Sequence, residues 1–260
     1  MRQLNKLSGH SKAKLERINN FWLERYPQED FAYDTYKYLI FDGTYFHKTG
    51  CLITVMDAVS GQVIINRYVD RERYENALVL FNELKRRGVK PKAVTLDGHK
   101  SVMAAVKDVW PDIILQRCLY HIQHEGMRWL RSYPKTQAGQ ELRVLLSDIS
   151  AIIDEGGRDF FMVRYEEWQQ KHGEFVRMLK ITSVAHKDLK KAMTLINNAL
   201  ADMFHFLKDN SIESTTNKLE SFYSRLKLDY QRHRGMSEGH KVSFLRWYCY
   251  FKNEQIINTF

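Results

Sequence analysis

Residues 36–45 read YKYLIFDGTY, a β-rich apolar run that ends in an acidic turn sequence. Two more β-rich runs follow, from Cys51 to Met56 and from Val63 to Val69, each after a stretch that contains glycine. Because glycine suits tight hairpin turns, the sequence predicts three consecutive antiparallel strands, the first of them from Tyr36 to Phe41.

The chain then alternates between helical and strand patterns. Apolar residues recur in helical register over residues 74–87, and residues 93–96 form a short apolar strand pattern. A second helix is predicted over residues 100–109 and a fifth strand over residues 113–115. The order β-β-β-α-β-α-β predicts an α/β protein whose mixed five-stranded sheet is flanked by crossover helices.

The second half of the chain reads as helical. Residues 122–210 show amphipathic patterns that predict an all-helical insertion, with breaks at Pro134, at Gly156–Gly157 and at Gly173. Two closing helices are predicted near residues 215–228 and 241–253. We therefore expect four parts: a helical segment (1–34), the first part of the core (35–121), the insertion (122–210) and the C-terminal core helices (211–260).

The N-terminal segment is predicted to form two short helices. Gly9 separates them, and Ser11 is placed to cap a basic second helix that carries Leu15, Ile18 and Trp22 at helical spacing. The pair could be the last two helices of a helix-turn-helix, a DNA-reading module. An amphipathic helical pair docked on the main domain would have the same pattern.

Composition indicates a folded protein without a membrane span. The chain has 260 residues, of which 44% are hydrophobic and 13% aromatic, and this excludes intrinsic disorder. No apolar run reaches the roughly 18 residues that a membrane-spanning helix needs. The three cysteines, at positions 51, 118 and 249, are too scattered for a disulfide framework, so we expect a reducing, cytoplasmic location.

The charge balance favours a polyanionic partner. Lys and Arg number 40 against 31 Asp and Glu, which leaves a formal net charge of +9. Nucleic acid is the first candidate, because cationic side chains release counterions from phosphates. The alternative is that the surplus only aids solubility.

Two aspartates follow apolar strands and each stands before a glycine. Asp42 comes after Leu39-Ile40-Phe41, and Asp97 comes after Val94-Thr95-Leu96. Two strands of one sheet that both end in this way can place two carboxylates side by side, where their repulsion calls for a cation such as Mg²⁺ or Mn²⁺. The alternative is ordinary turn chemistry, since Asp-Gly is a common turn dipeptide.

Glu220 is the candidate for a third carboxylate. It lies on a predicted helix beside an apolar stripe, on a polar line that also contains Asn217, so it can face a cleft while the stripe packs on the sheet. The alternative is a capping box of Asn217 and Glu220. Glu213 and Asp229 are the reserve candidates.

Two further groups carry potential chemistry. Cys118 and His121 form a C-x-x-H element, and the alternatives for it are half of a zinc site, ordinary packing, or a role in positioning DNA. A basic stretch after Glu220 could contact phosphates or could be a solvated loop. The predicted DNA-binding residues are Cys118, His121, Asn217, Arg225, Lys227, Arg232 and Arg234.

The ordered set of Asp42, Asp97, the C-x-x-H element and the Glu220 helix resembles the DDE transposases of bacterial insertion sequences, and most closely their mutator-type group. The resemblance implies a ribonuclease H-like catalytic domain with an all-helical insertion before the catalytic Glu. It implies that Asp42, Asp97 and Glu220 are the catalytic, metal-binding triad. It also implies that Cys118 and His121 match the family's C-x-x-H element, close to the active site.

The function implied by this resemblance is cleavage of transposon ends and strand transfer into target DNA, with two Mg²⁺ or Mn²⁺ ions. The implied partners are DNA and further copies of the chain, as a homodimer or higher oligomer, and the implied location is the nucleoid. Family members usually carry an N-terminal zinc-binding element, which the cysteine positions do not provide, so we expect a shortened N-terminus. The alternatives are a catalytically silent transposase-derived DNA-binding protein and a ribonuclease H-like nuclease without joining activity.

Overall fold

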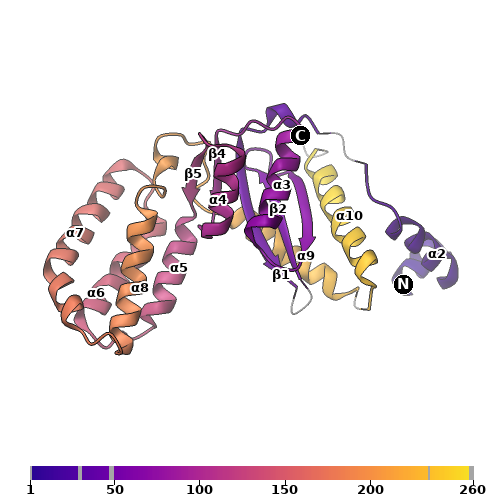
Figure 1. The fold of residues 1–260 in the computed structure, drawn as a ribbon. Helices are drawn as coiled ribbons and strands as arrows, with labels where there is room; N and C mark the ends of the chain where they lie inside the picture. The colour runs from indigo at the N-terminus through magenta and orange to yellow at the C-terminus, as the bar shows by residue number, and fades with distance from the viewer. Residues whose placement is uncertain (1, 29–30, 47–49, 234, 258–260) are drawn as a thin grey trace.

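The protein is built on a mixed five-stranded sheet with the strand order β3-β2-β1-β4-β5 (Figure 1). The computed structural model describes residues 2–28, 31–46, 50–233 and 235–257. β1 pairs with β2 and β2 with β3 in antiparallel fashion, whereas β4 runs parallel to both β1 and β5. This is the topology of the ribonuclease H-like fold, and it confirms the predicted fold class. The strands are β1 (Tyr38–Tyr45), β2 (Cys51–Asp57), β3 (Val63–Val69), β4 (Ala93–Leu96) and β5 (Ile114–Arg117).

The first strand differs from its predicted bounds. It was expected to run from Tyr36 to Phe41, but β1 continues to Tyr45 because its pairing with β2 extends to Cys51. Asp42 therefore lies within a strand and is not at a strand end as the Asp-Gly dipeptide suggested. Asp42 instead lies just beyond the end of the shorter ladder that β1 forms with β4. The last pair of that ladder is Ile40 with Thr95.

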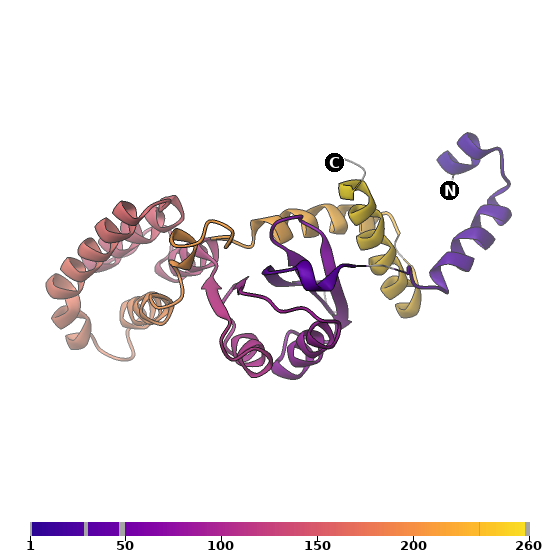
Figure 2. The same ribbon diagram turned by 90° about the horizontal axis from the view of Figure 1, so that it is seen from above.

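Helices cover both faces of the sheet (Figure 2). Side chains alternate along β1, so Leu39 and Phe41 face the cluster of α3 and α4, while Ile40 faces the cluster of α9 and α10. This alternation fixes which side of the sheet the last helices cover. The helices are α3 (Tyr74–Arg86), α4 (Lys100–Val109), α9 (Asn217–Gln231) and α10 (Glu238–Ile257).

A helical insertion extends from the β5 edge of the sheet and has its own apolar core (Figure 1). It contains α5 (Leu119–Leu130), α6 (Gln137–Asp148), α7 (Glu155–Met178) and α8 (Val184–Ala199). The predicted break at Gly173 is wrong, because α7 runs through it, with Trp168, His172 and Val176 buried on both sides of the glycine. Burial of that face outweighs the cost of about 1 kcal/mol for glycine in a helix. The bounds of the four parts stay predictions.

The N-terminal segment forms the two predicted helices, α1 (Arg2–Ser8) and α2 (Lys12–Leu23). The Ser11 hydroxyl accepts a hydrogen bond from the Lys14 N–H at 3.3 Å, which is the predicted cap. α2 docks on α10 through Trp22, whose ring centroid lies 5.3 Å from that of Trp247. This contact fits a docked helical pair, and a DNA-reading role for the segment stays a prediction.

Short 3₁₀ turns complete the chain, at Tyr33–Thr35, Ile149–Ala151 and His205–Leu207. None of the helices that the structure describes is both long enough and apolar enough to cross a membrane.

Candidate active site

The register of β1 and β4 brings Asp42 and Asp97 to matching positions. Ile40 pairs with Thr95, and each aspartate comes two residues after its member of that pair. Neighbouring strands lie about 4.8 Å apart, so the two aspartates lie near each other just beyond the end of the parallel ladder. The two carboxyl groups also interact electrostatically, because the charge of Asp97 raises the pKa of Asp42.

Each aspartate uses one carboxyl oxygen locally. Asp42 Oδ1 accepts from the Gly43 N–H, and Asp97 Oδ1 accepts from the His99 N–H, both at 2.8 Å. The bond to His99 is the turn bonding that the alternative interpretation of Asp-Gly predicts. The second oxygen of each carboxyl has no hydrogen bond to any described residue and is therefore available to a ligand.

Helix α9 brings Glu220 to the same side of the sheet. The Tyr223 hydroxyl donates to the Asp42 carbonyl at 2.7 Å and so attaches α9 to β1. Tyr223 comes less than one helical turn after Glu220. Glu220 contributes to raising the pKa of Asp42, so the three predicted carboxylates interact electrostatically. The capping-box interpretation is wrong, because Thr216 and not Asn217 occupies the N-cap position.

Replacement of Tyr223 by Phe tests this attachment. The variant loses the hydrogen bond to the Asp42 carbonyl in a fully buried position, and we expect the free energy of unfolding to fall by about 0.5–1.5 kcal/mol. Denaturant unfolding measures the change. The matched control is Tyr133→Phe, whose side chain is 91% exposed and should leave stability unchanged. An equal loss in both variants would contradict the role of this bond.

Burial makes the Asp42 carboxyl more basic than an exposed one. Burial raises the pKa of Asp42 from 3.8 to about 7; His121 and the Gly43 N–H oppose the rise, and Asp97 and Glu220 add to it. Asp42 therefore holds a proton more strongly than an exposed carboxylate does. In their present positions, no three Asp, Glu, His or Cys side chains of the described ranges form a ready metal-binding group.

Glu72 is a fourth carboxyl at this site that sequence reasoning missed. Burial, followed by the charges of Asp97 and Asp42, raises the pKa of Glu72 from 4.5 to about 8. Its carboxyl lies so close to the Gly43 backbone that a Cβ at position 43 would clash with it. A glycine inside a strand often marks such a close approach, so Gly43 was the sequence signal for a neighbour at this point.

The C-x-x-H element joins the start of α5 to the start of α9. The fully buried Cys118 thiol accepts from the Thr216 N–H at 3.3 Å, and the Thr216 hydroxyl lies 3.4 Å from His121 Nδ1. On its other side, His121 Nε2 lies 3.7 Å from Glu220 Oε1. Burial lowers the pKa of His121, but Cys118, Asp42 and Asp97 outweigh this effect and raise it from 6.5 to about 9. The element therefore presents a cationic ring to the carboxyl cluster.

A family model described as "Transposase, Mutator family" matches residues 11–236. The chain belongs to the Mutator family of transposases. The match spans all four carboxyls of the cluster and the C-x-x-H element.

Two other comparisons add context. No curated protein sequence matches the transposase. Among solved structures, it is similar to the crystal structure of the catalytic core domain of BIV integrase, with 13% sequence identity and a TM-score of 0.28. That similarity covers 54% of this chain and 99% of the integrase chain.

The predicted DNA-binding residues of the transposase do not form one group. Lys227 interacts electrostatically with Cys51, as do Asp42 and Glu72, so it lies near the carboxyl cluster. Asn217 and Arg225 instead line a groove of about 710 Å³ between α9 and α10. Arg232 pairs with Asp229 at 3.2 Å, and Arg234 lies outside the described residues.

The remaining candidates have other partners. The reserve carboxylate Glu213 pairs with Lys218 at 2.6 Å, and the reserve Asp229 pairs with Arg232. Cys118 is fully buried, so its thiol is not accessible to DNA in this conformation. These contacts leave Glu220 as the third carboxylate of the predicted triad that interacts with Asp42.

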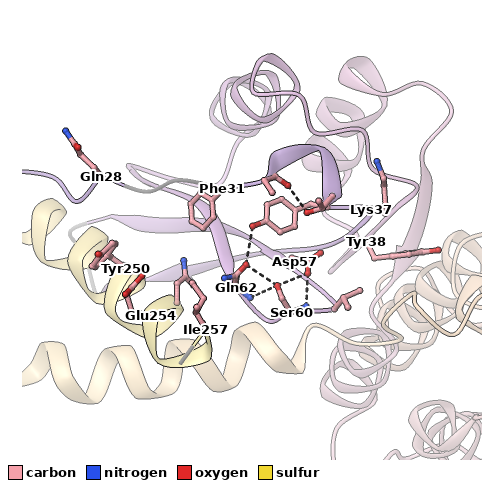
Figure 3. A pocket seen from close by; sticks show the side chains of 15 residues that line it. Gln28, Phe31, Lys37, Tyr38, Asp57, Ser60, Gln62, Tyr250, Glu254 and Ile257 are labelled. Atoms are coloured by element: carbon pink, nitrogen blue, oxygen red, sulfur yellow. Dashed lines mark hydrogen bonds between the residues drawn. The ribbon is translucent and has the colours of Figure 1, made fainter. Parts of the chain in front are cut away.

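A cavity of about 730 Å³ lies away from the carboxyl cluster of the transposase, where β1 begins and β2 turns into β3 (Figure 3). Its polar groups already bond one another, because Ser60 donates to Asp57 and Tyr36 donates to Gln62. This network needs no ligand to complete it, so we do not place the chemistry there.

Proposed function

We propose that this chain is a DNA transposase that cleaves transposon ends and transfers the freed strands into target DNA. Asp42, Asp97 and Glu220 are proposed as its catalytic residues and as the ligands of two Mg²⁺ or Mn²⁺ ions. The observation that supports the proposal is the register of β1 and β4, since both aspartates come two residues after its last pair and each keeps one carboxyl oxygen free of hydrogen bonds to described residues.

The donor set suits hard divalent cations. All the candidate ligands are carboxylate oxygens, which Mg²⁺ and Mn²⁺ prefer. Burial raises the pKa of Asp42, and the charges of Asp97 and Glu220 add to the rise; a bound cation would relieve their repulsion. When bound, such ions activate an attacking hydroxyl and stabilise a leaving 3′-oxygen.

The other residues position the reacting groups. Thr216 and His121 contact Glu220 and orient it, and we propose that Cys118 anchors Thr216 without touching DNA. Glu72 is proposed as a fourth ligand or as the group that orients Asp42. Among the predicted DNA contacts, His121 and Lys227 lie nearest the scissile phosphate in this proposal.

DNA contacts farther from the cluster complete the proposal. Asn217 and Arg225 would guide the duplex along the groove of α9 and α10, and Arg232 and Arg234 would bind backbone phosphates beyond it. Two ends must be handled together, so we also expect a dimer or higher oligomer, which light scattering would detect. DNA binding would keep the protein with the nucleoid.

The decisive experiment compares substrates under the same ionic conditions. We expect Mg²⁺-dependent cleavage of DNA that carries the element's own ends, free 3′-hydroxyl groups, and products joined to target DNA. Hydrolysis confined to RNA–DNA hybrids would instead identify a nuclease without joining activity. Salt-dependent DNA binding with no cleavage in Mg²⁺ or Mn²⁺ would identify a silent DNA-binding protein.

A further inference from the structure

A second cavity, of about 630 Å³, lies between the core and the helical insertion. Its walls come from α4, the end of β5, α5 and α8, which lie around the junction of the two parts in Figure 1. On α8 the lining residues recur every three or four positions and form one face of the helix. The cavity is therefore built from both parts of the chain.

The lining of this cavity is strongly cationic. It contains no Asp or Glu, and its cations are Lys100, Arg117, Lys187, Lys190 and Lys191. Within the described ranges, none of the four lysines forms an ion pair, whereas Lys171 elsewhere in the insertion pairs with Glu141 at 2.7 Å. Lysines with no acidic partner around a concave surface favour an anionic ligand.

Arg117 gives an independent sign of a missing partner. The residue is only 6% exposed, and its Nε has no hydrogen-bond acceptor among the residues of the structure. A buried donor of a charged group that lacks an acceptor destabilises the fold. The guanidinium lines the cavity and lies directly against Gly98, where any side chain would clash with it.

The cavity adjoins the carboxyl cluster. Gly98 lines it and directly follows Asp97, and the charge of Asp97 also acts on Arg117. Its lining also contains the apolar side chains of Met103, Trp129 and Leu195. An anion that also has flat and apolar parts matches this mixed lining better than a small inorganic ion does.

We propose that this cavity binds the phosphodiester backbone of the DNA strand that leads away from the scissile bond on the Asp97 side. Arg117 and the α8 lysines hold consecutive phosphates, and the deoxyribose and base lie toward Trp129. The proposal rests on the proposed function, because it takes the carboxyl cluster as the place of cleavage. It assigns to the helical insertion the task of holding the strand in line with the site.

The test measures DNA binding without catalysis. Binding of labelled DNA is followed by fluorescence anisotropy in EDTA over a range of salt concentrations, for the wild type and for the double variant K190Q/K191Q. We expect the negative slope of log affinity against log salt to become shallower by about 1 for each lysine removed. The affinity at 0.1 M salt should fall roughly tenfold or more. The charge-matched control is K90Q/K135Q, two exposed lysines outside the cavity.

A second measurement locates the strand. All three native cysteines are buried, so Thr194→Cys would place a single exposed thiol in the cavity for a photo-crosslinker. We expect crosslinks to DNA next to the cleavage position from Thr194→Cys, and none from Thr35→Cys in the cavity of Figure 3. The absence of crosslinks at position 194 would overturn the proposal.

Two outcomes of the binding test overturn this inference, namely an unchanged salt slope or an equal loss of affinity in both double variants. The proposed function fails separately. If lysine-dependent DNA binding is present but no DNA is cleaved in Mg²⁺ or Mn²⁺, the cavity assignment stands and the transposase chemistry does not.

Discussion

Replacement of Asp42 or Asp97 by Asn, or of Glu220 by Gln, is expected to lower the rate of Mg²⁺-dependent DNA cleavage by roughly 10³-fold or more. A bound divalent ion supplies several kcal/mol of transition-state stabilisation, and about 1.4 kcal/mol corresponds to a factor of ten in rate. Because Asn and Gln keep the size of the side chain, the loss should come from ligand charge and not from unfolding. Single-turnover cleavage of end-bearing DNA measures it.

The chain offers matched controls for this prediction. Asp229 lies on the same helix as Glu220 but pairs with Arg232, and Glu213 pairs with Lys218. Asp229→Asn and Glu213→Gln should therefore keep activity within a few-fold of the wild type. Full activity in all three cluster variants would remove the basis of the proposed chemistry, whereas a loss in the controls as well would point to a general loss of folding.

Glu72→Gln separates the fourth carboxyl from the triad. A ligand role predicts a weaker response to Mg²⁺, with activity partly recovered at higher ion concentration. A role in orienting Asp42 predicts a slower reaction at every ion concentration. Titration of the cleavage rate with Mg²⁺ distinguishes the two, and an unchanged titration would show that Glu72 takes no part in the reaction.

The sequence predicts the sheet well because its signals are local. The strands from Val63 to Val69 and from Ala93 to Leu96 have their predicted bounds, since each is an apolar run bounded by polar or glycine-containing segments. The nearness of Asp42 and Asp97 was a prediction from two strands of one sheet that each lead into Asp-Gly, and no local pattern shows that β4 pairs with β1. β1 was predicted too short because its extension to Tyr45 depends on pairing with β2, which no local pattern shows.

The residues that sequence reasoning missed depend on long-range contacts. Glu72 stands in the charged run Asp70-Arg71-Glu72-Arg73, which is typical of a solvated turn, and only the close approach to Gly43 turns it inward. Arg117 is the last residue of β5, a position where the sequence suggests an exposed cation. It is buried because the helical insertion packs over β5. Composition and periodicity contain no information about either contact.

The metal-free protein is expected to lose thermal stability as the pH rises from about 4 to about 8, and Mg²⁺ should restore it. The pKa of Asp42 is raised from 3.8 to about 7 and that of Glu72 from 4.5 to about 8, so the native state binds protons more tightly than the unfolded state. Stability then falls with pH across this range. His121 acts in the same direction, because its raised pKa gives stability that is lost as the pH passes about 9.

Cations should act most strongly where the carboxyls are ionised. At ten times its dissociation constant an ion adds about 1.4 kcal/mol of stability. Since 1 kcal/mol is worth about 2–4 °C in a domain of this size, a shift of several degrees should appear at pH 8 and little at pH 5. Asp42→Asn removes one of the repelling charges, so without ions it should melt above the wild type at pH 8 and respond less to Mg²⁺. Differential scanning calorimetry measures both effects, and a wild-type Mg²⁺ response that is the same at pH 5 and pH 8 would contradict a carboxylate metal site.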